Sequence, residues 1–267
     1  DTTKAIFDRE ALLGVSITGW MNNPDILFDG KILEKGAEIV KETNKRVAEL
    51  LGINAAARTT CVKPSGNASV LLGTASGIHA EHSEQYIRNI QLNKDSEVAQ
   101  LIAKTNPNMV EDSVWSANGT DFVVSFPITP KQGSILKDKL IGTDHLDLVA
   151  KAQKHWVNTG KNPELCADPT VSHNVSNTIL VEDWDDVAEY VYSNRDNFAG
   201  ISFLSTSGDK DFNQAPNTEV LDAEKMVEKY GVAAVLASGL VVDGLQAFDD
   251  LWMGCMTAQG YGEDISA

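Results

Sequence analysis

The chain of 267 residues has few cysteines and no long hydrophobic run. Its three cysteines, Cys61, Cys166 and Cys255, lie far apart and form no CxxC pair, so the sequence indicates neither a disulfide framework nor a zinc ribbon. We therefore expect a reducing, cytoplasmic location. The chain has no apolar run of about 18 residues, the length that a membrane helix needs, and no basic-then-apolar signal pattern. No membrane association is expected.

Positive charge is also scarce. The chain has 22 Lys and Arg against 38 Asp and Glu, a net charge of −16. Such a charge disfavours unspecific attraction to nucleic acids or anionic membranes, although local donors could still bind a nucleotide. A hydrophobic content of 42% indicates a globular chain with a sizeable core. The sequence begins at Asp1 without Met, so we expect a fragment or one piece of a divided protein.

One stretch, RTTCVKPSGNASVLLGTASGIHAEH from Arg58 to His82, predicts a strand, a turn and a helix in that order. Residues 58–63 favour an extended segment, Pro64 ends it, and Ser65-Gly66-Asn67 has turn chemistry. A helix that begins directly after a strand directs its unpaired N–H groups and positive dipole end outward, where phosphate binds well. An ordinary strand-to-helix turn has the same local pattern, and the P-loop pattern GxxxxGK[ST] is absent.

Strand and helix patterns alternate along the chain, which predicts an α/β fold formed by residues 1–267 as a single unit. Residues 82–105 have a partial helical pattern and 106–120 resemble a loop. Helices are predicted over 4–12, 31–51 with Gly52 as its cap, 144–158, 183–194 and, with interruptions near Gly231 and Gly239, 222–248. Strands are predicted over 13–20, 58–63, 122–126 ended by Pro127, 173–181 and, as a buried strand, 198–204.

Extended stretches of the chain resemble the adenosylcobalamin-dependent class II ribonucleotide reductases. The central stretch CVKPSGNASVLLGTASGIHAEH is followed by YIRNIQLNKDSEVAQLI. The other similar stretches are LLGVSITGWMNNPDIL (12–27), MVEDSVWSAN (109–118), HNVSNTILV (173–181), NFAGISFL (197–204), GDKDFNQAPN (208–217) and ASGLVVDGLQAFDDLW (237–252). The resemblance covers nearly the whole chain in order and is more specific than any single motif.

The resemblance implies the ten-stranded α/β barrel of the reductase and glycyl radical type, with this chain as roughly its second half. It implies reduction of ribonucleotides to deoxyribonucleotides for DNA synthesis, with adenosylcobalamin (a vitamin B12 cofactor) and an external dithiol reductant such as thioredoxin. In the family a thiyl radical forms on a cysteine in an Asn-x-Cys-x-Glu motif, which is absent here. We therefore expect no catalytic residue in this chain, no activity from it alone, and a need for the missing N-terminal half of the barrel.

The resemblance also places the substrate's phosphates at the predicted turn. The family usually has Thr at the position of Asn67. Here an amide replaces that hydroxyl donor, so the resemblance does not carry over the side-chain contact of this residue to phosphate. Substrate diphosphate and triphosphate would use the same turn. The phosphate-binding residues carried over are Ser65, Gly66, Asn67, Ala68 and Ser69, and the active-site loop is Pro64, Gly77, Ile78 and His79.

Other interpretations of these residues are less specific. His79 and His82 are three residues apart, but no third metal ligand is evident nearby, so we predict no metal site. Cys61 is most simply a small buried thiol next to the turn. Two alternatives for function remain: a non-catalytic module that binds nucleotide phosphate within a split assembly, and an unrelated phosphate-binding α/β enzyme.

Overall fold

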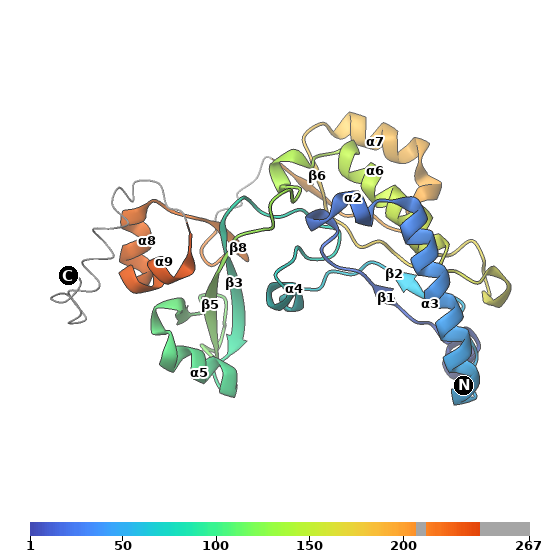
Figure 1. Ribbon diagram of the computed structural model, residues 1–267, viewed down its shortest axis with the longest axis horizontal. Helices are drawn as coiled ribbons and strands as arrows, with labels where there is room; N and C mark the ends of the chain where they lie inside the picture. Colours follow the sequence, from blue (N-terminus) through green and yellow to red (C-terminus); the bar gives the residue numbers. More distant parts are fainter. Residues whose placement is uncertain (207–211, 241–267) are drawn as a thin grey trace, which may run out of the picture. The chain divides into compact units, whose positions relative to one another are not determined.

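The computed structural model describes residues 1–206 and 212–240, with the backbone but not the side chain of Asn67 (Figure 1). Among these residues no helix has the length and apolar character needed to cross a bilayer. The helices are α1 (Thr2–Glu10), α2 (Pro24–Leu27), α3 (Gly30–Leu51), α4 (Asn67–Leu72), α5 (Glu97–Thr105), α6 (Thr143–Ala152), α7 (Trp184–Ser193), α8 (Ala223–Tyr230) and α9 (Val232–Ser238). The strands are β1 (Val15–Ser16), β2 (Thr60–Cys61), β3 (Tyr86–Asn93), β4 (Val110–Asp112), β5 (Asp121–Ile128), β6 (Ile179–Val181), β7 (Phe203–Ser205) and β8 (Asn217–Glu219). Shorter helical turns are η1 (Trp20–Asn22), η2 (Pro107–Met109), η3 (Lys137–Lys139), η4 (Gln153–Asn158), η5 (Pro163–Leu165) and η6 (Arg195–Asn197).

The chain forms two compact units, which are described separately. Unit 1 comprises Asp1–Glu81 with Pro130–Gly208, and unit 2 comprises His82–Thr129 with Asp209–Ala267. The sequence alone predicts one α/β unit over 1–267, and that assignment stays a prediction. The interrupted helix predicted over 222–248 is found as α8 and α9, separated at Gly231 as expected. Its last part and Cys255 lie outside the described residues.

The strands of unit 1 are parallel. β1 pairs with β2, and β6 pairs with β7, each pair in parallel register. Between the two pairs, Val62 forms a parallel bridge with Val175, and the backbone of Val62 exchanges hydrogen bonds with Asn174 and Ser176 at 3.1 and 2.8 Å. Parallel strands joined through helices confirm the predicted α/β fold.

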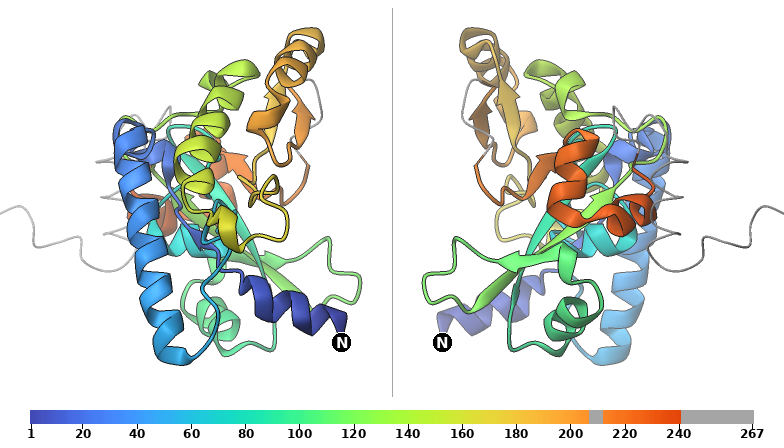
Figure 2. Two further views of the ribbon diagram at one scale, coloured as in Figure 1. Left: turned by 90° about the vertical axis from the view of Figure 1, so that its right-hand side faces the viewer. Right: turned by 90° about the vertical axis from the view of Figure 1, so that its left-hand side faces the viewer.

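Three helices pack against the parallel strands (Figure 2). Leu33 of α3, Leu146 of α6 and Val187 of α7 belong to the same buried cluster as Val62 and Ile179 from the strand layer. Helix α3 starts where the Asp29 carboxylate accepts hydrogen bonds from the first-turn backbone, and it ends at Gly52, whose φ is +67°. The predicted boundaries of this helix are thus confirmed to within one residue.

The end of the α6–η4 helical segment packs directly on β2. The Thr60 hydroxyl donates to the Trp156 carbonyl at 2.7 Å, and the Trp156 indole N–H donates to the Cys61 carbonyl at 3.0 Å. A Cβ at Gly160 would lie 1.9 Å from Thr60 Oγ1, so only glycine permits this approach. These contacts fix the strand that leads into the predicted turn.

Unit 2 contains an antiparallel sheet in the order β4-β5-β3-β8, with α8 and α9 contributing to its core. The partial helical pattern over 82–105 was misleading, because its first half is the strand β3 and only its second half is the helix α5. Pro127 does not end its strand, since it pairs with Ile87 inside β5. The Asn89 N–H donates to the Pro216 carbonyl on the β8 side of β3. Because backbone groups alternate in direction along a strand, the nitrogen of Pro127, which lies opposite Ile87, faces away from β3. Strand β4 covers that edge of β5 only up to Val124, so Pro127 has no strand there to which an N–H would donate.

All four strands predicted in unit 1 are shorter than expected, since residues 58–63 and 173–181 are strand only at Thr60–Cys61 and Ile179–Val181. Within residues 13–20 only Val15–Ser16 are strand, and the strand predicted over 198–204 is found at Phe203–Ser205, one residue beyond the predicted end. The buried character predicted for the latter is wrong, because Phe203 and Leu204 are 40% and 48% exposed. Among the described residues β7 pairs only with β6, so it stands at the edge of its sheet.

Candidate functional site

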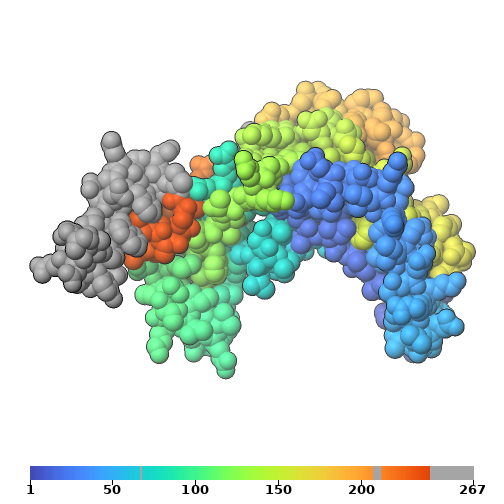
Figure 3. Space-filling model, viewed as in Figure 1, coloured from blue at the N-terminus to red at the C-terminus, as the bar shows by residue number. Residues whose placement is uncertain are grey.

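The predicted turn lies directly after β2. The chain leaves the sheet after Val62, passes through exposed Lys63 and Pro64, and enters helix α4 through Gly66. Gly66 has a φ of +51°, a region that favours glycine, and no atom lies within 4 Å of the place where a Cβ would stand. Helix α4 stands at the surface, with Leu71 89% exposed (Figure 3). The backbone at Gly66 is therefore open to an approaching group.

The first turn of α4 is closed by its own residues. The Ala68 backbone N–H donates to the Ser65 carbonyl at 3.0 Å, and the Ser69 hydroxyl donates to the Gly66 carbonyl at 2.7 Å. Ser69 is buried, so its hydroxyl shapes the turn from within. The side chain of Asn67 lies outside the described part of the structure.

Three hydroxyl groups, on Thr18, Ser65 and Ser76, brace the turn. Thr18 Oγ1 lies 2.8 Å from Ser65 Oγ, donates to the Ala75 carbonyl at 3.0 Å and accepts from the Gly77 N–H at 2.9 Å. Thr18 has one proton and the carbonyl can only accept, so the arrangement that satisfies every group has Ser65 donating to Thr18. Sequence reasoning missed Thr18, which is 47 residues from Ser65.

Ser76 gives the turn its second brace. Its Oγ accepts hydrogen bonds from the backbone N–H groups of Ser65 at 3.0 Å and Gly66 at 3.3 Å. Two consecutive N–H groups therefore converge on one oxygen atom, an arrangement that also suits an anionic oxygen. Ser76 was not among the predicted site residues, although it lies inside the quoted TASG sequence.

The second predicted segment, Gly77, Ile78 and His79, lies against the first. A Cβ at Gly77 would stand 2.9 Å from the Lys63 carbonyl oxygen, and the φ of Gly77 is +57°. Ile78 is fully buried, while His79 is half-buried and bonds through Nδ1 to the Ser76 carbonyl at 2.9 Å. The structure thus brings the loop residues predicted at positions 77–79 together with the predicted turn.

A buried histidine of α6 holds this second segment through a hydrogen bond to its backbone. His145 of α6 is only 3% exposed and donates from Nε2 to the Ile78 carbonyl at 3.1 Å. Burial lowers the pKa of His145 to about 4; the Ile78 carbonyl opposes the shift, and nearby His79 adds to it. His145 is consequently neutral near pH 7 and acts as a fixed hydrogen-bond donor.

Asn22 holds both ends of the same loop. Its Oδ1 accepts from the Ala75 N–H at 2.7 Å, and its Nδ2 donates to Glu81 Oε1 at 2.6 Å and to Ser134 Oγ at 3.0 Å. Asn22 and Glu81 are 5% and 2% exposed. This network makes residues 75–81 part of a rigid scaffold.

The other candidate chemistry has less structural support. The described residues contain no group of three or more His, Cys, Asp or Glu side chains that could hold a metal ion. His82 belongs to unit 2, where its ring packs on Tyr86 with centroids 5.6 Å apart. Burial raises the pKa of the Cys61 thiol, an effect that the charge of Lys63 partly offsets, so Cys61 is a poor nucleophile. Half-buried Cys166 makes long contacts to two backbone carbonyls.

Comparison with known proteins links the chain to one group of enzymes, although no family model matches it. It is 29% identical over 174 residues to a probable adenosylcobalamin-dependent ribonucleoside-triphosphate reductase of Dictyostelium discoideum, a match covering 63% of this chain and 22% of the relative. It is 26% identical over 164 residues to the adenosylcobalamin-dependent ribonucleoside-triphosphate reductase of Euglena gracilis, covering 60% of this chain and 22% of that protein. The similarly named Levilactobacillus brevis protein is 26% identical over 190 residues, covering 70% and 23%.

The fold comparison agrees with the sequence comparison. The crystal structure of a B12-dependent class II ribonucleotide reductase matches with a TM-score of 0.63 and 19% identity, covering 89% of this chain and 36% of that chain. The predicted resemblance to these reductases is therefore confirmed in sequence and in fold. The chain spans only about a fifth of the length of the curated relatives it matches.

Proposed function

We propose that this chain is part of an adenosylcobalamin-dependent ribonucleotide reductase, an oxidoreductase that converts ribonucleotides to deoxyribonucleotides for DNA synthesis. The observation that carries the proposal is the agreement between three curated relatives and a solved structure, all named as reductases of this type. In the complete enzyme the unit 1 strands would form part of a ten-stranded barrel. The reaction would take place in the cytoplasm.

The turn at Gly66 is our proposed site for the phosphates of the ribonucleotide. Three features support it: the open flank of Gly66, the two converging N–H groups of Ser65 and Gly66, and the strand end that leads into the turn. Ser76 Oγ occupies the position where a phosphate oxygen would accept the same two hydrogen bonds. The proposed binding residues remain Ser65, Gly66, Asn67, Ala68 and Ser69, with Pro64, Gly77, Ile78 and His79 shaping the loop beside them.

The role of this chain in the reaction is to bind and orient. Thr18 and Asn22 hold the turn and the loop in one arrangement, so a phosphate that took the place of Ser76 Oγ as acceptor would be positioned without reorganisation of the backbone. The radical cysteine and the Asn-x-Cys-x-Glu motif would be supplied by the rest of the enzyme, and electrons by an external dithiol such as thioredoxin. The chain alone would be inactive.

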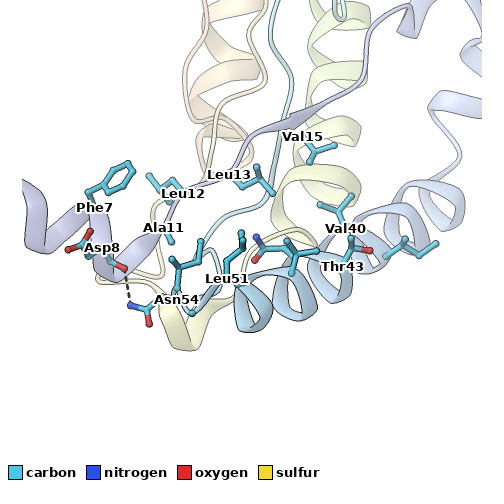
Figure 4. A pocket seen from close by; sticks show the side chains of 16 residues that line it. Phe7, Asp8, Ala11, Leu12, Leu13, Val15, Val40, Thr43, Leu51 and Asn54 are labelled. Atoms are coloured by element: carbon cyan, nitrogen blue, oxygen red, sulfur yellow. Dashed lines mark hydrogen bonds between the residues drawn. The ribbon is translucent and has the colours of Figure 1, made fainter.

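Adenosylcobalamin, when bound to the complete enzyme, would supply the radical. The described residues do not bring together a set of side chains that fits it. An apolar groove exists in unit 1 between α1, residues 11–15 and the second half of α3 (Figure 4), but its Asn44 and Asn54 side chains are already hydrogen-bonded within the chain. The many amide groups of a corrin would find few partners there. We therefore assign no cofactor contact to this chain.

A hybrid enzyme tests the proposed function. In it, this chain replaces the segment of the Levilactobacillus brevis reductase that it matches. With adenosylcobalamin, a ribonucleoside triphosphate and a dithiol, we expect formation of the deoxyribonucleotide. A folded hybrid that binds the nucleotide but forms no deoxyribonucleotide would contradict the catalytic assignment and favour the alternative, a non-catalytic module that binds nucleotide phosphate.

A further inference from the structure

The hydroxyl group of Ser76 fills the place where a phosphate oxygen would bind at the turn. Its Oγ accepts hydrogen bonds from the backbone N–H groups of Ser65 at 3.0 Å and Gly66 at 3.3 Å. Each backbone N–H carries one proton and makes one well-aligned hydrogen bond at a time. Ser76 Oγ and a phosphate oxygen therefore exclude each other as acceptors for these two groups.

The backbone on both sides of Ser76 is fixed by hydrogen bonds. The Ala75 N–H donates to Asn22 Oδ1 at 2.7 Å, and the Gly77 N–H donates to Thr18 Oγ1 at 2.9 Å. Both acceptors belong to the segment between β1 and α2, which precedes the loop in the chain. The peptide groups next to Ser76 are consequently held in place by partners that do not depend on the direction of its hydroxyl group.

The hydroxyl group itself is positioned by a single torsion. Rotation of Ser76 about its Cα–Cβ bond to another staggered rotamer carries Oγ away from both N–H groups. Among the described residues Ser76 Oγ donates no hydrogen bond, so the two bonds that it accepts are what holds it. Displacing this hydroxyl group therefore breaks two hydrogen bonds of modest net strength and requires no movement of the backbone.

We propose that Ser76 is an internal competitor of the substrate's phosphate and thereby sets the affinity of the site. The hydroxyl group satisfies the N–H groups of Ser65 and Gly66 until a phosphate oxygen replaces it on the same two donors. A site that is open only in the fraction of molecules whose Ser76 hydroxyl has turned away binds its ligand more weakly, in proportion to that fraction. This inference rests on the proposed function, because it takes phosphate as the ligand of the turn.

Removal of the hydroxyl group tests the competition in the hybrid enzyme. Ser76→Ala removes the competing oxygen. Thr74→Val is the matched control two residues away, because Thr74 Oγ1 is buried and has no hydrogen-bond partner among the described residues. Isothermal titration calorimetry gives the dissociation constant of inorganic tripolyphosphate, a probe with neither ribose nor base. Gly66→Val shows whether the probe binds at the turn, where it should weaken binding.

We expect Ser76→Ala to bind tripolyphosphate about fivefold more tightly than the unsubstituted hybrid, while Thr74→Val leaves the dissociation constant unchanged. A residue that only supported the turn would have the opposite effect, because its loss would loosen the site. Weaker or equal binding by Ser76→Ala would therefore overturn the proposal. Absence of tripolyphosphate binding, or binding that Gly66→Val does not weaken, would overturn it together with the phosphate site.

Ser76→Cys takes the place of Ser76→Ala if the alanine variant does not fold. Its thiol fills the space beside the turn but accepts hydrogen bonds only weakly. Ser76→Cys should therefore also bind tripolyphosphate more tightly than the unsubstituted hybrid. Weaker or equal binding by this variant has the same meaning as for the alanine variant.

Turnover and binding separate this inference from the proposed function. If Ser76→Ala tightens tripolyphosphate binding in a hybrid that makes no deoxyribonucleotide, the competition is supported and the function is contradicted. If the hybrid turns over and Ser76→Ala does not tighten binding, the function is supported and the competition is overturned. In an active hybrid Ser76→Ala should lower KM for the ribonucleoside triphosphate by a similar factor and change kcat by less than about twofold, because only phosphate binding is altered.

Discussion

The two ends of the parallel strands in unit 1 differ in their surfaces: the polar groups at one end are hydrogen-bonded to one another, and the apolar side chains at the other end are uncovered. At the carboxyl end of β2, hydroxyl, amide and backbone groups bond to one another around residues 64–81. At the amino end of β1, Leu12 and Leu13 line an open apolar groove. A rigid polar loop suits a small charged ligand, whereas an uncovered apolar surface suits another part of a protein. The two ends should therefore respond very differently to substitution.

The largest expected effect is at Gly77. The Gly77→Ala variant places a Cβ 2.9 Å from the Lys63 carbonyl oxygen and forces alanine to adopt a φ of +57°. We expect the free energy of unfolding to fall by about 3 kcal/mol, from backbone strain and overpacking together. Urea unfolding measures it. Gly73→Ala is the matched control, because its φ is +63° but its surroundings are open, and it should lose only about 1 kcal/mol.

Acid should lower the free energy of unfolding, because His145 beside the loop of residues 75–81 is buried in its neutral form. Its pKa is lowered to about 4 in the fold, so between pH 6.5 and 4 the unfolded chain binds the additional proton. The stabilisation present above pH 6.5 is then lost as the pH falls toward 4, by about 3 kcal/mol at most. Unfolding free energies measured across this range should show a smaller pH dependence in His145→Gln, which keeps a donor for the Ile78 carbonyl. An unchanged dependence would contradict a neutral buried His145.

Alanine substitutions of Asn22 and Asn54 compare a polar side chain at the loop of residues 75–81 with one at the apolar groove. Asn22→Ala leaves the Ala75 N–H and the Glu81 carboxylate without this partner in a buried place, and we expect a loss of about 2 kcal/mol. Asn54→Ala removes one exposed hydrogen bond at the groove and should cost about 0.5 kcal/mol. Equal losses in urea unfolding would show that the polar end is not more tightly constrained than the groove.

The smallest effect is expected at Leu50 of α3. Leu50 is 77% exposed, so Leu50→Lys should change the free energy of unfolding of the chain alone by no more than about 0.5 kcal/mol. A large loss in urea unfolding would mean that Leu50 is already packed within unit 1.

Sequence patterns predicted the elements whose signals are local. Helix α3 follows from its apolar spacing and from Gly52 at its end, both within the segment itself. Strand β3 was missed because its partners are distant in sequence: β5 begins at Asp121 and β8 at Asn217. Its polar residues fit a strand only once these neighbours are in place.

The candidate site shows the same limit. The turn at Gly66 could be predicted because strand end, glycine and helix start are consecutive in the chain. Its braces could not, since Thr18 and Asn22 reach the loop from 47 and 53 residues away in the contacts with Ser65 and Ala75. Ser76 is nearer, but nothing in a single sequence distinguishes it from other serines in loops.

The Michaelis constant of the hybrid enzyme for its ribonucleotide tests the central claim most directly, when Gly66→Val is compared with Gly73→Val. Both glycines have positive φ values and open surroundings at opposite ends of α4, so Gly73→Val controls for a β-branched residue at positive φ, although the ψ of −123° at Gly66 strains valine more than the αL conformation of Gly73 does. If the turn binds phosphate, Gly66→Val should raise KM by about tenfold or more, while Gly73→Val changes it by less than about twofold. Equal KM values for the two variants would contradict a phosphate site at this turn.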